Sequence, residues 1–508
     1  HLSKAHCLRI MNYSIKSIKW NHFDRSGIYR AKNTMKKILV WFRNDLRISD
    51  NEVLYTASME GEVLPVYIFD PRDFGKTTFG FDKTGPYRAK FLIDSVQDLS
   101  NNLKDLEAEL LTVVGKPELL LPELVKTYHI DELYVNREVT INEIQIEGKV
   151  EEALTIPVRK FWGSTLFHID DLPFDDINDI PDVFTNFRKK CEKYSEIRRS
   201  YPKPDTLNSI KPHQVKEPDL NALVPEMKAP SEKSVISFKG GESNGLKRLK
   251  EYIWEKDLLK SYKKTRNGLL GGDYSTKFSA WLANGSVSPR TIYEEVKRYE
   301  DERVNNQSTY WLIFELIWRD YFRFSAFKYG SDIFKAGGIQ KKDRSWDVNE
   351  ELFHAWASGK TGIPFIDANM RELNETGFMS NRGRQNVASF LAQNLNIDWR
   401  MGAEYFEQML IDYDPASNYG NWAYNATVGH DPRNRYFNIL NQAERYDKDG
   451  SYTKYWLDEL KHLPNEFIHE PNRIESEQIE NSGIEHKIDY PSPIINLEVS
   501  YEQIKSRE

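Results

Sequence analysis

Short apolar runs separated by amphipathic stretches fill the first third of the chain. The runs have the length of β-strands and lie at residues 38–42, 63–69, 110–114, 133–135 and 158–162. Strands that alternate with helices are typical of a parallel sheet covered by helices on both faces. Right-handed crossovers make such a sheet doubly wound. The pattern therefore predicts an α/β domain over residues 36–168.

The pattern changes between residues 169 and 242, where prolines gather. Eight of the chain's 22 prolines lie between Leu172 and Pro230. Proline removes a backbone donor and breaks helices and ladders. We therefore expect a long connector over residues 169–242, with one short helix near residues 184–199.

Apolar residues recur with a helical period from Ser243 onwards. The runs at residues 245–254 and 310–322 show it most clearly. This period predicts an all-helical domain over residues 243–465. The remaining residues, 466–508, are polar and acidic and predict a mobile tail, although the stretch D-Y-P-S-P-I-I-N could dock on the protein.

The amino-acid composition limits the kinds of binding partner and of structural site that the chain can have. The chain has 508 residues, with 70 Lys and Arg against 77 Asp and Glu, so its net charge of −7 requires any nucleic acid to meet a local basic patch. Its two cysteines, Cys7 and Cys191, are far apart and near no histidine cluster, which argues against a disulfide framework and a metal site. We expect a reducing, intracellular setting. No run of 18 apolar residues predicts a membrane segment.

The first 34 residues differ from the rest. They carry seven Lys and Arg against one acid, Asp24, which is similar to an organelle transit peptide. Met35 immediately precedes the first apolar run, so we prefer to interpret residues 1–35 as an extension outside the fold. A bacterial protein would then be cytoplasmic, whereas a true transit peptide would direct it to an organelle.

Two segments of the helical half carry unusual polar groups. Residues 381–424 include N-R-G-R-Q-N-V-A-S-F-L and D-Y-D-P-A-S-N-Y-G-N-W-A-Y, with charged and amide side chains among aromatic ones. Such groups need partners when buried, although a helical core with ordinary surface charges is the alternative. Residues 271–279, G-G-D-Y-S-T-K-F-S, place hydroxyls and glycines where a helix is expected to start, near Ser275 and Thr276. This suits a diphosphate, or an ordinary helix cap.

Together these motifs resemble the photolyase and cryptochrome family. The resemblance also includes T-G-I-P-F-I-D-A-N-M-R-E-L at residues 361–373 and W-F-R-N-D-L-R-I-S-D-N at residues 41–51. The sequences D-Y-S-T-K-F-S, W-R-D-Y-F-R-F and R-Y-F-N-I-L-N-Q-A-E-R-Y-D are similar to those of the DASH subfamily. The resemblance covers residues 36 to about 464.

The resemblance implies FAD in the centre of the helical domain. It assigns these residues to the cofactor: Tyr262, Ser275, Thr276, Lys277, Phe278, Ser279, Arg319, Arg384, Asp412, Asp414 and Asn418. Arg384 and Asp412 match a buried ion pair beside the isoalloxazine. Asn418 would face N5, which favours the behaviour of a fully reduced flavin. The diphosphate segment is one residue longer than the family's, and Phe278 replaces a leucine.

The same resemblance implies a substrate side and an electron path. Glu315 and Trp318 would lie in the substrate cavity, and Asn381 and Arg382 would contact both flavin and DNA. The positions of a tryptophan chain are occupied by Trp346, Trp399 and Trp422. From the residues alone, Glu315 and Arg319 could be a helix-surface ion pair, and the three tryptophans could be core residues.

Departures from the family concern the lesion pocket. Gln385 and Tyr424 stand where related photolyases have methionine and tryptophan. A more polar wall should stack less well on a base extruded from duplex DNA, so we expect a preference for single strands. The candidates for phosphate contacts are Lys341, Lys342, Arg344, Arg382, Arg433 and Arg435, although a solvated charged face is the default for each.

Glu143 matches a position that contacts the pterin of 5,10-methenyltetrahydrofolate, with a surface glutamate as the alternative. The function implied is light-driven repair of cyclobutane pyrimidine dimers in single-stranded DNA, by one electron from reduced FAD, in a monomer. The alternative is a blue-light receptor that signals through flavin photoreduction. A flavin-free helical scaffold would require the motif matches to be accidental.

Overall fold

The computed structural model describes residues 35–213, 220, 223, 227–431, 433, 436–474 and 489–507. The expectations for residues 1–34 and for Arg435 lie outside the described residues. From Lys36 onwards the described chain forms one unit.

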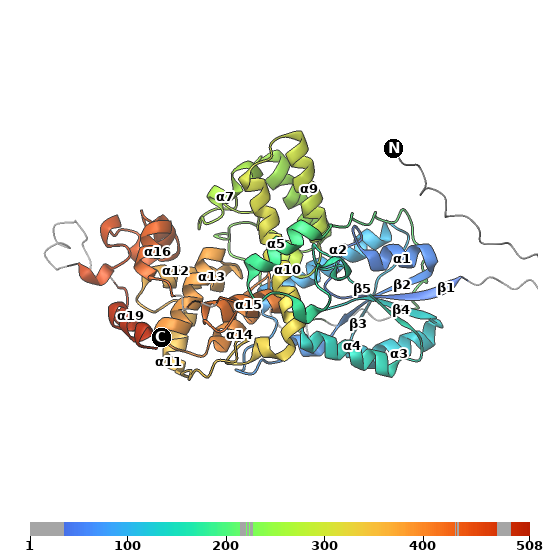
Figure 1. Cartoon of the computed structure of the whole chain (residues 1–508), viewed down its shortest axis with the longest axis horizontal. Coiled ribbons are helices and arrows are strands. Elements are labelled where there is room, and N and C mark those ends of the chain that lie inside the picture. The colour runs from blue at the N-terminus through green and yellow to red at the C-terminus, as the bar shows by residue number, and fades with distance from the viewer. Residues whose placement is uncertain are drawn as a thin grey trace, which may run out of the picture. The chain divides into compact units, whose positions relative to one another are not determined.

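A five-stranded parallel sheet forms the core of the N-terminal domain (Figure 1). Its strands are β1 (Lys36–Phe42), β2 (Gly61–Phe69), β3 (Leu111–Val114), β4 (Glu132–Asn136) and β5 (Val158–Phe161). Their order is β3-β2-β1-β4-β5, so the chain winds outwards from β1 in one direction and then in the other. The predicted doubly wound sheet is confirmed.

Helices cover both faces of this sheet because its strands are apolar on both sides. The helices are α1 (Glu52–Glu60), α2 (Pro86–Lys104), α3 (Pro117–Tyr128) and α4 (Ile141–Ala153). Val40 and Phe42 of β1 belong to the core cluster with α1 and α2, whereas Leu39 and Trp41 belong to the cluster with α3 and α4. This alternation places successive side chains on opposite faces.

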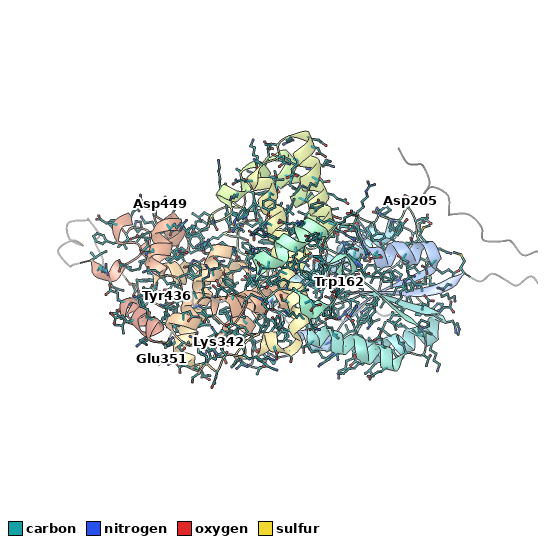
Figure 2. The ribbon with its side chains drawn as sticks, in the orientation of Figure 1. Trp162, Asp205, Lys342, Glu351, Tyr436 and Asp449 are labelled. Carbon is teal, nitrogen blue, oxygen red and sulfur yellow. The ribbon has the colours of Figure 1, made fainter. Side chains whose placement is uncertain are left out.

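The connector contains one α-helix of the predicted kind. α5 spans Phe184–Tyr194, so it ends before residue 199. At the boundary between the domains, Trp162 follows β5 and stacks on Phe324, with ring centroids 5.7 Å apart (Figure 2).

The second half is helical, as predicted. Its helices are α6 (Glu242–Lys250), α7 (Tyr262–Thr265), α8 (Ser279–Ala283), α9 (Pro289–Glu302), α10 (Gln307–Tyr329), α11 (Glu350–Ala357), α12 (Pro364–Thr376), α13 (Asn381–Ser389), α14 (Trp399–Met409), α15 (Pro415–Asn425), α16 (Ile439–Tyr446), α17 (Ser451–Trp456) and α19 (Leu497–Ser506). Single π-helical turns follow α6 and α13, the second at η8 (Phe390–Asn394).

Polar side chains cap several helix starts in this domain, among them those of α13 and α15. Ser380 caps α13 by accepting from the amide of Gly383, and Asp414 caps α15 by accepting from the amide of Ser417. Such caps satisfy amides that have no partner within the helix. Both capping residues also line the cavity described below.

The described end of the chain docks on the helical domain, which the sequence left open. Tyr490 is 9% exposed and donates its hydroxyl to Asp367. Ile494 donates its amide to the carbonyl of Thr361 at 2.9 Å, and Asn394 of η8 donates to Ser500 at 2.9 Å. Residues 489–507 are therefore held by hydrogen bonds, so the stretch D-Y-P-S-P-I-I-N docks, as the sequence allowed, and these residues do not form a mobile tail.

Candidate functional site

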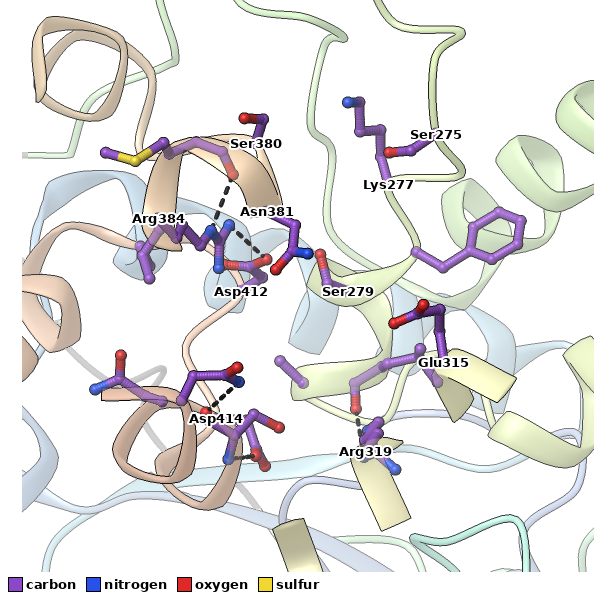
Figure 3. A pocket seen from close by; sticks show the side chains of 18 of the residues that line it. Ser275, Lys277, Ser279, Glu315, Arg319, Ser380, Asn381, Arg384, Asp412 and Asp414 are labelled. Atoms are coloured by element: carbon purple, nitrogen blue, oxygen red, sulfur yellow. Dashed lines mark hydrogen bonds and ion pairs between the residues drawn. The ribbon is translucent and has the colours of Figure 1, made fainter. Parts of the chain in front are cut away.

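A cavity of about 300 Å³ lies within the helical domain (Figure 3). Its wall comes from α7, the segment before α8, α10, the start of α13 and the segment from α14 to α15. The cavity brings together these predicted residues: Tyr262, Ser275, Thr276, Lys277, Phe278, Ser279, Glu315, Arg319, Asn381, Arg384, Gln385, Asp412, Asp414, Asn418 and Trp422.

One side of the cavity is the segment that leads into α8. Arg248 holds this segment by donating to the carbonyls of Gly272 at 2.7 Å and Thr276 at 3.1 Å. Lys277 has a φ of 62°, in the left-handed region that helices do not use. The expected helix start near Ser275 is therefore wrong, because the helix begins only at Ser279, after this turn.

The amine of Lys277 is buried without a hydrogen-bond acceptor among the described residues. It lies over the ring of Tyr274, 2.9 Å from the ring centre. Burial lowers the pKa of this amine well below its ordinary value, and the attraction of Glu372 does not offset the burial. A ligand anion in the cavity would supply the missing partner.

The predicted ion pair forms on the opposite wall. Arg384 donates to Asp412 at 2.9 Å and to the carbonyl of Met379 at 2.9 Å (Figure 3). The other oxygen of Asp412, Oδ1, is buried and has no hydrogen-bond partner among the described residues. The pair therefore presents a fixed charge arrangement with a free acceptor.

Asp414 is held by a residue that the sequence analysis missed. Arg323 donates to Asp414 at 2.7 Å and to Glu138 at 2.9 Å. Burial would raise the pKa of Asp414, but the charges of Arg323 and Arg319 outweigh it and hold this pKa below its ordinary value. Arg323 lies within the quoted motif W-R-D-Y-F-R-F, where a charge in an apolar helix was the available signal.

Glu315 and Arg319 do not form the surface ion pair that the spacing allowed. Glu315 pairs with Arg266, which also lines the cavity and was missed by the sequence analysis. Arg319 donates to the carbonyls of Ser164 at 2.5 Å and Leu282 at 3.0 Å. Burial raises the pKa of Glu315, and the charge of Arg266 opposes this rise.

Buried polar atoms without partners test whether the residues fit a flavin nucleotide. Among the described residues, the unpaired atoms on the cavity wall are Lys277 Nζ, Gln385 Oε1, Asp412 Oδ1 and Trp422 Nε1. Unpaired buried polar atoms are rare in native proteins. These four atoms are two donors, one of them the Lys277 amine, and two acceptors, which fits a ligand with a diphosphate and a ring that both donates and accepts.

The other two predicted tryptophans lie behind the cavity. Trp422 lines it, whereas Trp399 is fully buried and Trp346 is partly buried. The indoles of Trp346 and Trp399 both donate to the carbonyl of Ala336, at 3.1 and 3.0 Å. Trp318 also lies outside the cavity wall and stacks on Phe184, with ring centroids 3.5 Å apart.

Most predicted DNA contacts lie outside the cavity and have partners within the protein. Arg344 donates to Gln393, Asn396 and two carbonyls, and its guanidinium lies 3.9 Å from the centre of the Trp346 ring. Arg382 donates to Asn267 and lies over the Tyr446 ring.

Tyr424 and Arg433 both bind Asp431. Tyr424 donates its hydroxyl to Asp431 at 2.9 Å. Arg433 pairs with the same carboxylate at 3.1 Å, and its side chain is 67% exposed. Arg433 is therefore an exposed cation, as is Lys341 with a side chain 74% exposed, whereas Tyr424 points its hydroxyl to the protein.

A second cavity, of about 830 Å³, lies at the carboxyl ends of β1 and β2 and contains Glu143. Glu143 caps α4 together with Thr140 and accepts from Asn44 at 3.4 Å. Burial and the charge of Glu138 raise the pKa of Glu143. Glu143 is therefore a partly exposed helix residue that lines this cavity.

The part of the chain that the structure describes contains neither a membrane-spanning helix nor a metal-binding cluster. No helix there is long and apolar enough to cross a membrane. The same residues contain no group of three His, Cys, Asp or Glu side chains placed to hold a metal ion.

Comparison with known proteins agrees with this geometry. Residues 311–507 match the family model "FAD binding domain of DNA photolyase", and residues 38–206 match "DNA photolyase". Cryptochrome DASH of Gloeobacter violaceus is 52% identical over 470 residues, which cover 91% of this chain and 93% of that protein. Cryptochrome DASH, chloroplastic/mitochondrial, of Solanum lycopersicum is 50% identical over 479 residues, 90% of this chain and 82% of that protein.

Among solved structures, the Synechocystis cryptochrome is 49% identical and superimposes with a TM-score of 0.90, covering 94% of this chain and all of that one. The chain therefore belongs to the photolyase/cryptochrome family, within its cryptochrome DASH group, and its helical half is an FAD-binding domain of the DNA photolyase type.

Proposed function

We propose that the protein uses light to repair cyclobutane pyrimidine dimers in single-stranded DNA, with reduced FAD bound in the cavity of the helical domain. One observation carries the proposal. The same cavity is lined by the flavin-side residues Arg384, Asp412 and Asp414 and by the substrate-side residues Glu315 and Gln385. A cofactor and a damaged base could therefore meet within one enclosure.

Reduced FAD, when bound, supplies the electron that splits the dimer; the protein supplies binding, orientation and charge. Arg384 and Asp412 present a fixed ion pair to the ring. Asn418 donates its amide to the carbonyl of Ala403 at 3.0 Å, which fixes the orientation of the side chain on the cavity wall. Lys277 and the hydroxyls of Ser275 and Ser279 would hold the diphosphate.

Glu315 is the group proposed to contact the damaged base. Its carboxyl accepts from Arg266, and its pKa is raised by burial. An ionised Glu315 would accept from a base N–H, and a protonated Glu315 would donate to a base carbonyl. Arg266 favours the ionised state before substrate enters.

The preference for single strands rests on the polar wall. Gln385 lines the cavity with a buried oxygen that has no partner among the described residues. An apolar side chain there would stack on an extruded dimer and help to offset the cost of flipping it from a duplex. Flipping a dimer out of a single strand costs much less free energy.

The second cavity is proposed to bind 5,10-methenyltetrahydrofolate as an antenna, with Glu143 accepting from the pterin. Reconstitution with folate should give one bound equivalent in the wild type and less in Glu143→Gln. We further propose a monomer. An organelle location, like that in the tomato relative's name, would depend on residues 1–34.

A receptor function is the second candidate, and two observations favour it. Trp422 lines the cavity, and the buried Trp399 shares a carbonyl acceptor with the partly buried Trp346, an arrangement that could pass electrons. The docked residues 489–507 contact η8, the turn that follows α13 on the same wall. Light-dependent proteolysis of residues 489–507 would support signalling, and cleavage that is equal in light and darkness would oppose it.

The repair proposal is tested by counting dimers in a single-stranded oligonucleotide after illumination, with a dark control. Wild-type protein loaded with reduced FAD should remove them only in light. Glu315→Ala should lose most of this activity, whereas Glu302→Ala, an exposed acid on α9, should keep it. No light-dependent loss of dimers with the wild type would contradict the proposal.

A further inference from the structure

A buried arginine joins the flavin cavity to the α/β domain. Arg323, on α10, is 3% exposed. Its Nη1 donates to Asp414 at 2.7 Å, and its Nη2 donates to Glu138 at 2.9 Å. Asp414 belongs to the cavity wall, whereas Glu138 follows β4. One guanidinium therefore spans the two domains.

The position of this guanidinium depends on those two carboxylates. Its third donor, Nε, has no hydrogen-bond partner among the described residues. The planar fork of arginine fixes the angle between its two terminal donors. The position of Glu138 therefore determines where the charged guanidinium of Arg323 lies relative to Asp414.

Glu138 is itself held from the side of the α/β domain. Its other oxygen accepts from Asn44 at 3.1 Å, and its amide donates to Glu147 at 2.9 Å. Glu147 pairs in turn with Arg43 at 2.5 Å. The anchor of Arg323 is therefore part of a fixed polar network.

Asp414 uses both oxygens to keep its orientation. Oδ1 accepts from the amide of Ser417 at 2.7 Å, and Oδ2 accepts from Arg323. Each ionised oxygen keeps a further acceptor site for a ligand. Without Arg323, only the charge of Arg319 and the hydrogen bonds from Ser417 would oppose the burial of this carboxylate, so its ionised state would be less stable and its orientation less fixed.

We propose that Arg323, anchored on Glu138, is a positioning residue that holds Asp414 ionised and oriented towards the flavin. The α/β domain thereby contributes to the polarity of the flavin pocket without touching the flavin. This inference rests on the flavin site of the proposed function.

The test compares FAD affinity and the flavin absorption spectrum in full-length variants. Arg323→Gln should weaken FAD binding by about tenfold or more, because it leaves a buried carboxylate without its partner, and should shift the absorption bands. Arg323→Lys should restore part of both properties because it keeps the charge. Glu138→Gln leaves the bond to Asp414 in place and should give a smaller change in the same direction.

A matched control separates positioning from general destabilisation. Arg290 and Asp50 form another buried pair between the domains, at 2.6 Å and with side chains 3% and 1% exposed, but neither lines the flavin cavity. Arg290→Gln should lower stability and leave the affinity and spectrum unchanged.

The inference is overturned if Arg323→Gln and Glu138→Gln keep the wild-type affinity and spectrum, or if Arg290→Gln reproduces their changes. If Arg323→Gln does not fold, the FAD affinities and absorption spectra of Arg323→Lys and Glu138→Gln are compared with those of the wild type and Arg290→Gln instead. Failure of the wild type to bind FAD would instead contradict the proposed function and this inference together.

Discussion

Trp346 and Trp399 donate their indole N–H groups to one acceptor, the carbonyl oxygen of Ala336, at 3.1 and 3.0 Å. A shared acceptor holds the two rings next to each other. Trp399 begins α14, which packs on α15, and α15 carries Trp422 on the cavity wall. We propose that the three indoles form an electron path from the cavity wall to the partly buried Trp346.

This path predicts the effect of removing its middle member. Trp399→Phe should sharply slow the photoreduction of bound FAD by an external reductant, because the step from Trp346 to Trp422 loses its relay. Trp281→Phe is the matched control, since Trp281 is also buried and hydrogen-bonded to a carbonyl but lies outside the cavity. Flavin absorbance under blue light measures both rates, and equal rates for the two variants would exclude this path.

Lys277 predicts proton uptake when FAD binds. Burial lowers the pKa of the free amine, and a diphosphate nearby would raise it again. At a pH between the pKa of this amine in the free protein and its pKa in the FAD complex, binding takes up one proton. The affinity for FAD should therefore fall as pH rises, by at most about tenfold per pH unit. Calorimetry in two buffers of different ionisation enthalpy measures the uptake.

In Lys277→Met the uptake should vanish and affinity should fall. Lys277→Arg keeps a charge at every pH studied and should bind FAD without uptake. Wild-type binding enthalpies that do not depend on the buffer would show that the amine does not change its protonation.

The close packing around Gly402 predicts that a larger side chain there would push α14 and α15 apart. A Cβ at this position would lie 2.2 Å from Cη2 of Trp422 and 2.6 Å from Cδ2 of Leu391. Gly402→Ala should therefore lower the free energy of unfolding by about 1–3 kcal/mol, the usual cost of overpacking a core, and reduce bound FAD by displacing Trp422.

The control is Gly148→Ala in α4, where nothing lies within 4 Å of the new Cβ. Alanine in a helix interior should stabilise it by about 0.5–1 kcal/mol relative to glycine. Urea unfolding measures both changes. A stable Gly402→Ala protein with full FAD content would mean that the two helices separate without cost.

Gln385 predicts the strand preference. Gln385→Met replaces an unpaired buried oxygen on the cavity wall with an apolar group, so the rate of duplex repair should rise relative to single-strand repair. Gln442→Met is the control, because Gln442 also has an unpaired buried oxygen but lies on α16, outside the cavity. Tyr424 donates to Asp431 outside the cavity wall, so Tyr424→Trp should change the ratio less.

The elements with strong apolar patterns were predictable. The runs at residues 38–42 and 63–69 lie within β1 and β2, because a strand buried on both faces must be apolar throughout. The start of α8 was not predictable, because the left-handed turn at Lys277 has no glycine to indicate it.

Long-range polar contacts were also beyond the sequence. Arg323 and Glu138 are 185 residues apart, and no local pattern pairs them. The docked end of the chain is held by hydrogen bonds to residues far away in sequence, such as that from Tyr490 to Asp367, and its polar composition does not indicate them. The cavity residues were predictable mainly because their motifs resemble those of the photolyase and cryptochrome family. A family's motifs indicate residues that meet only in the folded protein.

Light-driven repair changes the absorbance of the DNA itself, because splitting a thymine dimer restores two absorbing bases. Purified protein with reduced FAD is illuminated with blue light beside thymine-dimer oligonucleotides, single-stranded and duplex in parallel, and absorbance near 260 nm is followed. Absorbance should recover with the single-stranded oligonucleotide and should recover little with the duplex. No recovery in either, from a protein whose flavin is photoreducible, would contradict repair and favour the light receptor.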